Sequence, residues 1–485
     1  MNIARVSSVV GKLVLVISCT LAVPALVALS HGEQDAFWAF LTSIGIGSVF
    51  ALALQVAGRG ASENMFRREG MAVVALAWIV CTFVGCLPYI FTGVIESPIN
   101  AYFETMSGFT TTGASVLESS PNEPFPRSIL FWRCLTNWLG GVGIVVLFVA
   151  LLPALGVGGR LLFNLEVPGV GEKGFAPRIH SAATVLWVIY TILTAVEVGA
   201  LMLAGLDVFD AVCHSLSTMA TGGFSPHSAS VGHYNSSAVR IIVTVFMFLA
   251  GVNFTLYYQL RLGNWRVIWR DSELRCYVGI LLIVSLLIAW DLGRAGVFDG
   301  VGDSLLASTF TSVSIGTTTG FATEDFNRWP DFSRFLLVLL MFVGGCAGST
   351  AGGPKVIRIM VILKAMLLQL GRHIRPRRVS SLTVGGSGIS EEIVHGVTMM
   401  FCVFVATFLF GGVALLMMGL DLQTSLSASI ACVGNIGPGL GSVGPTGNYA
   451  DVPTAGKVLL SVLMLVGRLE VFTALSLFAP GLWRD

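Results

Sequence analysis

The chain has 485 residues, of which 54% are hydrophobic and only 11% are charged, and its mean hydropathy is +0.82. This balance excludes an ordinary soluble domain and indicates a membrane protein. The formal net charge of +1 gives no indication of a nucleic-acid partner.

Apolar stretches long enough to cross a hydrocarbon layer of about 30 Å recur along the chain. The first ones cover residues 13–29, 37–57, 72–91 and 129–152. A cleaved secretory signal is not expected, because no convincing small-residue cleavage site follows the first stretch and the second begins almost at once. Residues 1–70 are therefore predicted to form two N-terminal transmembrane helices.

Basic residues gather in alternate connections between the apolar stretches, whereas acidic residues such as Glu33, Glu96 and Glu118 lie in the others. The positive-inside rule places the basic connections in the cytoplasm, with both termini inside and about ten full spans. The basic residues are Arg59, Arg67 and Arg68, then Arg160, Lys173 and Arg178, then Arg261, Arg266, Arg270 and Arg275, and finally Lys355, Arg358, Lys364, Arg372, Arg375, Arg377 and Arg378.

Four of the non-basic connections begin with a short amphipathic piece, such as residues 99–109, that is too short to span the membrane. Each piece meets a turn that is mostly rich in threonine and glycine. A half-helix followed by irregular backbone is typical of a re-entrant loop, since such backbone is tolerated at membrane depth only where it is buried in protein or lines water. The loops cover residues 96–127, 207–238, 299–332 and 420–455.

A glycine occupies the third place of each turn, and the four glycines are separated by about 100 to 120 residues. A second glycine follows about 25 to 30 residues later, inside the next apolar stretch. This fixed period indicates four repeats, which can surround one axis, although the fourth turn lacks threonine. The turns are Thr111-Thr112-Gly113-Ala114, Thr221-Gly222-Gly223-Phe224, Thr318-Thr319-Gly320-Phe321 and Asn435-Ile436-Gly437-Pro438, and the second glycines are Gly141, Gly251, Gly345 and Gly467.

These turns have the composition of a cation filter. A bare potassium ion needs a stack of oxygens in place of its hydration shell, and backbone carbonyls supply them where glycine permits the conformation. A threonine hydroxyl can add a further oxygen. The half-helices point their partly negative C-terminal ends at the centre of the membrane, which favours a cation. The turns contain no carboxylate, whereas a calcium-selective filter would be expected to contain carboxylates.

The chain resembles the Trk/Ktr/HKT superfamily of potassium transporters, and within it the TrkH type. The resemblance covers essentially the whole length. It rests on the loops MSGFTTTGAS, STMATGGFS, VSIGTTTGFAT and ACVGNIGPG, and on the segments WLGGVGIVVLFVALLPALGVGG and GRLEVFTALSLF. The two extra N-terminal helices favour the TrkH type over the shorter Ktr subunits. The implied fold is an all-α polytopic protein of a bacterial inner membrane, with helix–pore loop–helix repeats at residues 71–158, 159–270, 271–378 and 379–485 around one pseudo-fourfold pore.

The resemblance also implies the transported ion, potassium, and the residues whose backbone oxygens coordinate it. Within the superfamily, a serine in place of the first filter glycine goes with sodium permeation. All four places are glycine here, which implies a preference for potassium, whereas Asn435 in place of threonine leaves the strictness of selectivity open. The expected filter residues are Thr110, Thr111, Thr112, Gly113, Ala220, Thr221, Gly222, Gly223, Thr318, Thr319, Gly320, Asn435, Ile436 and Gly437. Among them, the resemblance implies coordination by backbone oxygens of Thr111, Thr112, Ala220, Thr221, Thr318, Thr319, Asn435 and Ile436.

Residues 344–354 contain more glycine than a helix favours, so the span after the third loop is expected to break there. The resemblance implies a gating loop beneath the filter, whereas a kink at close helix contacts is the alternative. The hinge candidates are Gly344, Gly345, Gly348, Gly352 and Gly353.

Arg468 lies inside the last apolar stretch, where a charge is costly. The aligned positions in the other repeats are Val142, Val252 and Cys346. The resemblance places Arg468 in the permeation path, where its charge opposes a cation leak. A structural ion pair with Glu470 or with another buried carboxylate is the alternative.

The resemblance further implies a homodimer and a cytosolic nucleotide-sensing partner ring, TrkA. Any nucleotide would act through that partner, since no nucleotide motif is present and no covalent cofactor is expected. The basic residues from Lys355 to Arg378 are either solvated, topology-setting charges or a docking face. The nine cysteines are expected to be small buried hydrophobic residues, since no Cys-x-x-Cys pair occurs. The dispersed histidines, among them His214, His227 and His233, are expected to be ordinary surface or loop residues.

Two other functions are considered. A symporter coupled to protons or sodium would need a titratable group or a second ion site at mid-membrane, and Glu104, Glu197 and Glu470 are the candidates. A polytopic membrane enzyme is not supported, because the sequence contains no paired carboxylates, nucleophile with a base, or metal motif.

Overall fold

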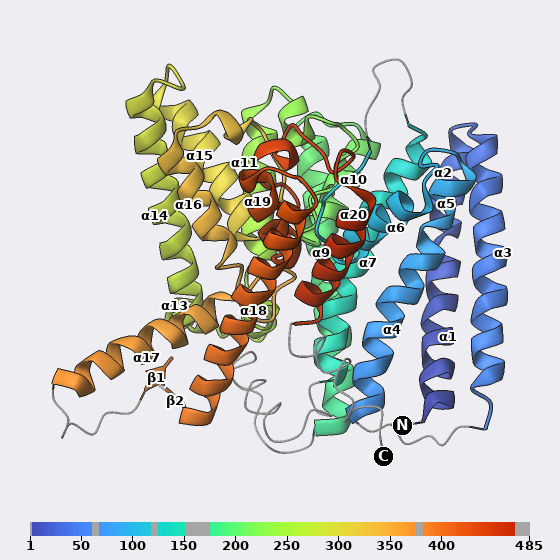
Figure 1. The fold of residues 1–485 in the computed structure, drawn as a ribbon, viewed down its shortest axis with the longest axis horizontal. Coiled ribbons are helices and arrows are strands. Elements are labelled where there is room, and N and C mark those ends of the chain that lie inside the picture. Colours follow the sequence, from blue (N-terminus) through green and yellow to red (C-terminus); the bar gives the residue numbers. More distant parts are fainter. Residues whose placement is uncertain are drawn as a thin grey trace.

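The computed structural model describes residues 2–60, 67–117, 125–151, 175–374, 382–385 and 387–470. Nearly all regular structure in these ranges is helical, which confirms the all-α class (Figure 1). The one sheet in the described part of the chain is an antiparallel hairpin of β1 (Thr383–Val384) and β2 (Ser387–Gly388).

The N-terminal helices pack beside the first repeat. Helices α1 (Ile3–Thr20) and α2 (Ala22–Ser30) together make one apolar span, and α3 (Gln34–Ala57) makes the second. Val6, Val10 and Val14 recur at the i, i+4 spacing and are buried in one hydrophobic cluster with Ala51 of α3. These two spans agree with the predicted pair of N-terminal transmembrane helices.

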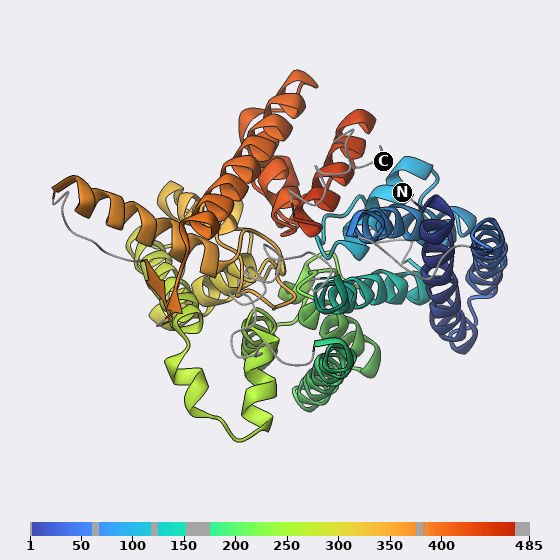
Figure 2. The same cartoon turned by 90° about the horizontal axis from the view of Figure 1, so that it is seen from below.

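Four groups of helices follow in chain order, and they surround a common centre when the molecule is viewed along the spans (Figure 2). The first group consists of α4 (Arg67–Gly85), α5 (Leu87–Phe91), α6 (Pro98–Phe109) and α7 (Arg127–Leu151). The second consists of α9 (Phe175–Leu203), α10 (Val208–Met219), η2 (Ser230–His233), α11 (Ser237–Ala250), α12 (Phe254–Arg261) and α13 (Arg266–Arg270). The third consists of α14 (Ser272–Ala295), α15 (Val301–Gly316), η3 (Phe326–Arg328), α16 (Asp331–Met341) and α17 (Val356–Ile374), and the fourth of α18 (Glu391–Met417), α19 (Leu422–Val433), η4 (Gly441–Val443) and α20 (Thr454–Arg468).

Six helical segments of the described chain are long and apolar enough to span a membrane, and a seventh qualifies if the bent pair α11 and α12 counts as one. The sequence predicts about ten full spans. The count of six covers the described residues only, and the helices that follow the filter in the second, third and fourth repeats are too short to qualify by themselves. Helix α11 ends at Ala250, α16 ends at Met341 and α20 ends at Arg468.

The two ends of the spans differ in charge. The beginning of α1, helix α13 and helix α17 lie at one end of the molecule, which we call the inner face (Figure 1). The first turns of α10 and α15, with the acidic residues Asp210 and Asp303, lie at the opposite end, the outer face. The basic connections containing Arg266 and Lys364 therefore share one face, as the alternation of charge predicts.

Six cysteines are buried, Cys276 is half-buried, and Cys19 and Cys402 are exposed. All nine are free thiols. The expected burial is therefore confirmed for most of them, whereas Cys19 of α1 and Cys402 of α18 lie on outward-facing sides of spans.

Candidate functional site

The four pore helices α6, α10, α15 and α19 end in the same capping motif. In the first repeat, the Thr111 N–H donates to the Gly108 carbonyl at 3.0 Å and the Thr112 N–H donates to the Ser107 carbonyl at 2.8 Å. Two such bonds, running back three and five residues, define a Schellman motif. Equivalent pairs of bonds start from Thr221 and Gly222, from Thr318 and Thr319, and from Asn435 and Ile436. Each helix therefore leads directly from its C-terminal end into the predicted filter.

The first residue after the cap is left-handed in every repeat, although none of the four is a glycine. The φ values are 52° at Thr111, 55° at Thr221, 59° at Thr318 and 53° at Asn435. A side chain opposes this conformation by about 1–2 kcal/mol, and such strain tends to persist at functional sites. The filter glycines, two residues later, also have positive φ values. The sequence predicts unusual backbone at the glycines alone, and its pattern gives no sign of these four strained residues.

The four glycines and the carbonyls of neighbouring repeats form a closed ring. In each repeat, the place where a Cβ would stand is within 2.5 Å of a carbonyl oxygen of the next repeat, closer than real Cβ contacts allow. The pairs are Gly113 with Gly222 (2.2 Å), Gly223 with Thr319 (2.0 Å), Gly320 with Ile436 (2.0 Å) and Gly437 with Thr112 (2.5 Å). Because the order returns from the fourth repeat to the first, the four turns surround one axis, and at each of these positions only a glycine fits.

The register of the second repeat differs by one residue from the expected pair of ligands. The family resemblance implies that the carbonyls of Ala220 and Thr221 coordinate the ion. Ala220 is the C-cap of α10, as Thr110 is the C-cap of α6. The Gly222 carbonyl lies in the ring at the position that Thr112 holds in the first repeat.

Threonine hydroxyls hold the filter backbone together. The Thr110 and Thr112 hydroxyl oxygens are 2.8 Å apart, and those of Thr317 and Thr319 are 2.7 Å apart. Asn435, which replaces threonine in the fourth repeat, donates through Nδ2 to the Thr112 hydroxyl oxygen at 3.0 Å. The asparagine thus ties the fourth turn to the first.

A second set of hydrogen bonds joins all four repeats on the outer side of the ring. Each pair of neighbours is linked once or more through the segment that follows a filter glycine. The links are Arg133 Nη1 to the Ser225 carbonyl (3.1 Å), the Gly232 N–H to the Ala322 carbonyl (3.0 Å), Asn327 Nδ2 to the Gly441 carbonyl (3.0 Å) and the Tyr449 N–H to the Ser115 carbonyl (2.8 Å). These contacts fix the four turns relative to one another.

Glu104 belongs to this outer framework. Its carboxylate accepts hydrogen bonds from Arg133 Nε at 2.8 Å, from the Val116 N–H at 2.8 Å and from the Ser115 hydroxyl at 3.0 Å. Both charges are buried, and a buried pair of this kind is satisfied only by such additional bonds. Glu104, a candidate for ion coupling from the sequence, therefore has a full set of structural partners.

An open cavity of about 340 Å³ lies on the outer side of the ring. Its lining includes the four filter glycines and the residues that follow them, from all four repeats. The cavity is open, so the outer side of the ring is accessible to water.

A non-helical loop between α16 and α17, residues 342–355, lies on the inner side of the ring. The positive φ values of Gly344, Gly348 and Gly353 explain three of its glycines. The other two permit close approach, since a Cβ on Gly345 would lie 2.6 Å from the Ala351 Cβ and one on Gly352 would lie 2.4 Å from the Gly434 carbonyl oxygen. The helix therefore breaks where the sequence predicts, and it forms a loop, not a kink.

This loop contacts the inner ends of the pore helices. The Gly352 N–H donates to the Thr318 hydroxyl at 2.6 Å. The Thr350 hydroxyl donates to the Met219 carbonyl at 3.0 Å, in the last turn of α10. With the approach of Gly352 to Gly434, the loop touches the second, third and fourth repeats.

Arg468 bridges the loop and the first repeat. Its side chain is buried, donating through Nη1 to the Thr350 carbonyl at 2.9 Å and through Nη2 to the Gly140 carbonyl at 3.1 Å. Glu470 instead pairs with Arg358 at 2.6 Å. Within the described part of the chain, Arg468 has no carboxylate partner, which contradicts the alternative of a pair with Glu470.

Glu273, which no pattern in the sequence singled out, joins the loop to α17. It is buried in the first turn of α14, and its Oε1 accepts the Ala347 N–H at 2.7 Å and the Ile357 N–H at 3.1 Å. One carboxylate oxygen thus joins Ala347, inside the loop, to the first turn of α17. No spacing in the sequence connects residues so far apart.

Three histidines gather at the outer face, although the sequence suggested that they were dispersed. His227 lies with Nε2 2.8 Å from an Asp210 carboxylate oxygen, and the Tyr234 hydroxyl donates to that oxygen at 2.5 Å. His233 stacks on His227 with 3.8 Å between ring centroids, and His214 lies next to them. Burial raises the pKa of Asp210, but the bonds from His227 and Tyr234 outweigh it and lower this pKa to about 2.

Comparisons with known proteins agree on one family. The family model TrkH, described as cation transport protein, matches residues 38–484. The chain is 39% identical to the Trk system potassium uptake protein TrkH of Escherichia coli K12 and 32% identical to TrkG of the same organism; each alignment covers 100% of this chain, and 100% and 99% of those proteins. The crystal structure of the potassium transporter TrkH from Vibrio parahaemolyticus superposes with a TM-score of 0.91 at 37% identity, over 100% of both chains.

Proposed function

The chain belongs to the TrkH family of cation transport proteins, and from this premise we propose that it takes up potassium across a bacterial inner membrane through a gated, channel-like pore. The observation that carries the proposal is the ring in which each filter glycine abuts a carbonyl oxygen of the next repeat. Such a ring supplies backbone oxygens to an ion that has left its water.

Two features of the ring favour a monovalent cation. The C-terminal ends of four helices meet there, and each contributes partial negative charge. The turns themselves contain no carboxylate, so the oxygens come from the backbone. Glycine at all four places supports potassium over sodium, as the family resemblance implies.

The loop of residues 342–355 and Arg468 form the gate in this proposal. Together they touch all four repeats on the inner side of the ring, where the Arg468 charge opposes a cation leaving the filter. Gly344, Gly348 and Gly353 act as hinges, since each already holds a conformation that a side chain resists.

The partners and orientation belong to the same proposal. The inner face is cytoplasmic by its basic connections, and it receives a TrkA-type nucleotide-binding subunit that regulates the gate. The protein is a homodimer in the membrane. The names of the relatives, which call each a component of a Trk system, support a multi-component assembly.

Coupled symport is a second candidate function, and the environment of Glu197 favours it. This residue of span α9 is fully buried, and neither carboxylate oxygen has a hydrogen-bond partner in the described structure. The Thr218 hydroxyl, on the adjacent pore helix, donates to the His214 carbonyl instead. Glu104 and Glu470 are both paired with arginines, so the coupling candidates narrow to Glu197.

The test is a flux assay on purified protein in vesicles, comparing potassium, rubidium, sodium and lithium with and without the partner ring. We expect potassium and rubidium to pass much faster than sodium and lithium, and the ring with nucleotide to change the rate but not the ion order. Equal rates for all four ions would contradict the proposed filter. A reversal potential that follows the proton gradient, and no longer does so in Glu197→Gln, would establish symport instead.

A further inference from the structure

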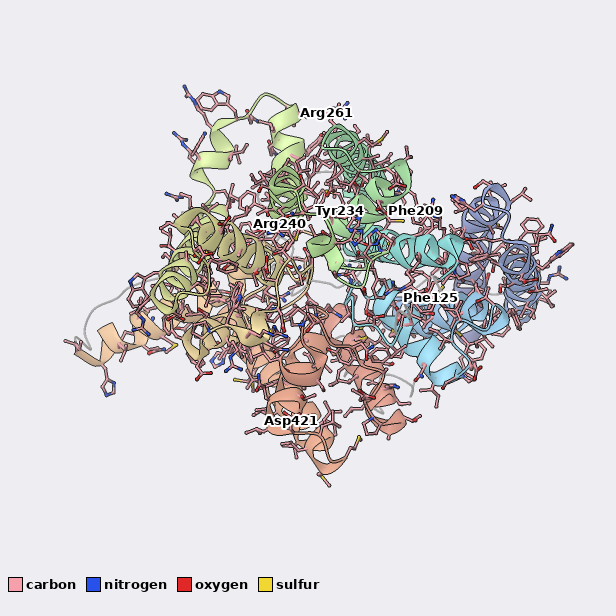
Figure 3. All side chains as sticks on the ribbon, turned by 90° about the horizontal axis from the view of Figure 1, so that it is seen from above. Phe125, Phe209, Tyr234, Arg240, Arg261 and Asp421 are labelled. Atoms are coloured by element: carbon pink, nitrogen blue, oxygen red, sulfur yellow. The ribbon has the colours of Figure 1, made fainter. Side chains whose placement is uncertain are left out.

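The hairpin of α12 and α13 at the inner face leaves the body of the molecule sideways. Helix α12 is bent by 90° from α11, so it runs across the direction of the spans. Viewed along the spans, the hairpin extends beyond the second and third repeats (Figure 2), and Figure 3 labels Arg261 at the outer edge of the molecule. This direction leads into the plane of the membrane, away from the pore.

The depth of the hairpin follows from its neighbour in the chain. Span α14 begins at Ser272, immediately after the hairpin, and runs for 24 residues toward the outer face. The end of a span of this length lies at the boundary between hydrocarbon and headgroups. The hairpin is therefore level with the headgroups of the inner leaflet.

Large apolar side chains of the hairpin are exposed. Trp269 is 74% exposed and Trp265 is 58% exposed, and Tyr258, Leu260 and Leu262 are exposed beside them. Indole and phenol rings concentrate at the membrane interface, because one end of each is apolar and the other is polar. In water, these exposed apolar side chains would have no apolar surface to pack against, which is unfavourable.

Four exposed arginines lie among these rings, namely Arg261, Arg266, Arg270 and Arg275. The two acidic residues beside them are occupied. Asp271 accepts the Leu274 N–H at 2.7 Å as the N-cap of α14, and Glu273 holds the loop from a buried position. Because four exposed arginines outnumber these two carboxylates, the surface presents net positive charge, and guanidinium groups bind phosphate oxygens through paired N–H donors.

We propose that the α12–α13 hairpin is a binding surface for anionic phospholipid headgroups. The tryptophans enter the interface between headgroups and acyl chains, and the arginines bind the lipid phosphates. This inference does not depend on which ion the pore conducts.

Fluorescence quenching tests the contact directly. The full-length protein is reconstituted into vesicles of brominated phosphatidylglycerol or brominated phosphatidylcholine, and Trp265→Phe/Trp269→Phe is measured in parallel. The difference between wild type and this variant reports the two hairpin tryptophans. We expect it to be quenched at least twofold more by the anionic lipid. No difference in quenching between the two lipids would overturn the proposal.

Charge variants test the role of the arginines. In a mixture containing one brominated phosphatidylglycerol per ten unbrominated phosphatidylcholines, Arg266→Gln/Arg270→Gln should reduce the enrichment of the anionic lipid by about tenfold or more. Arg294→Gln/Arg328→Gln is the matched control, because these arginines are 69% and 87% exposed but lie outside the hairpin. An equal loss in both variants would overturn the proposal. So would efficient disulfide crosslinking of Gly263→Cys between two copies in the bilayer, since a second copy would then cover the surface.

Discussion

Replacing one filter glycine by alanine tests whether the close contacts of the ring select the ion. A control variant shows the separate effect of placing a side chain on a left-handed residue. In Gly223→Ala, the new Cβ would stand 2.0 Å from the Thr319 carbonyl oxygen. That oxygen must withdraw by about 1 Å before the contact becomes tolerable, and it belongs to the set that would replace the water of the ion. We expect the ratio of potassium to sodium flux to fall at least tenfold, which corresponds to about 1.4 kcal/mol of discrimination.

The matched control is Gly93→Ala in the loop before α6. Gly93 has a φ of 70°, close to the 72° of Gly223, but nothing lies within 4 Å of its Cβ position. Both variants carry the left-handed strain of about 1–2 kcal/mol, so both should show a similar small loss of thermal stability from that source. Only Gly223→Ala should change the ion ratio, measured as rubidium and sodium uptake into vesicles. If Gly223→Ala keeps the wild-type ratio, the ring of carbonyls does not select the ion.

Three further predictions concern the gate and the outer face. Arg468→Ala should raise basal potassium flux several-fold in vesicles, because it removes the charge and both hydrogen bonds beneath the filter. If the charge is the barrier, flux through Arg468→Lys should stay near that of wild type. Unchanged flux in the alanine variant would refute this role. Glu273→Leu should lower the melting temperature and raise flux, since it leaves two buried N–H groups unsatisfied at about 1–3 kcal/mol each, whereas Glu273→Gln keeps the accepting oxygen and should behave like wild type. Asp210 has a pKa lowered from 3.8 to about 2, so its stabilisation is complete above pH 4 and is lost as the pH falls toward 2. The difference in free energy of unfolding between wild type and Asp210→Asn, roughly 1–2 kcal/mol above pH 4, should vanish over that range when it is followed by thermal melting, and a difference independent of pH would contradict it.

Local signals in the sequence determined the class of the protein and the positions of its turns. Long apolar stretches, the alternation of basic and acidic connections and a glycine at a fixed period are properties of chain segments, and no folded partner is needed to detect them. The break at residues 344–354 and the unusual charge of Arg468 were evident for the same reason. The family resemblance then supplied the expectation of one pore.

The tertiary structure alone decided which atoms meet. The closure of the ring from Gly437 back to Thr112, and the bonds of Glu273 to the loop and to α17, join residues far apart in the chain. The pairing of Glu470 with Arg358 instead of Arg468 likewise depends on how separate helices pack. Such contacts follow from the packing of whole repeats around an axis. The spacing of residues along the sequence does not give the distance between two residues in space.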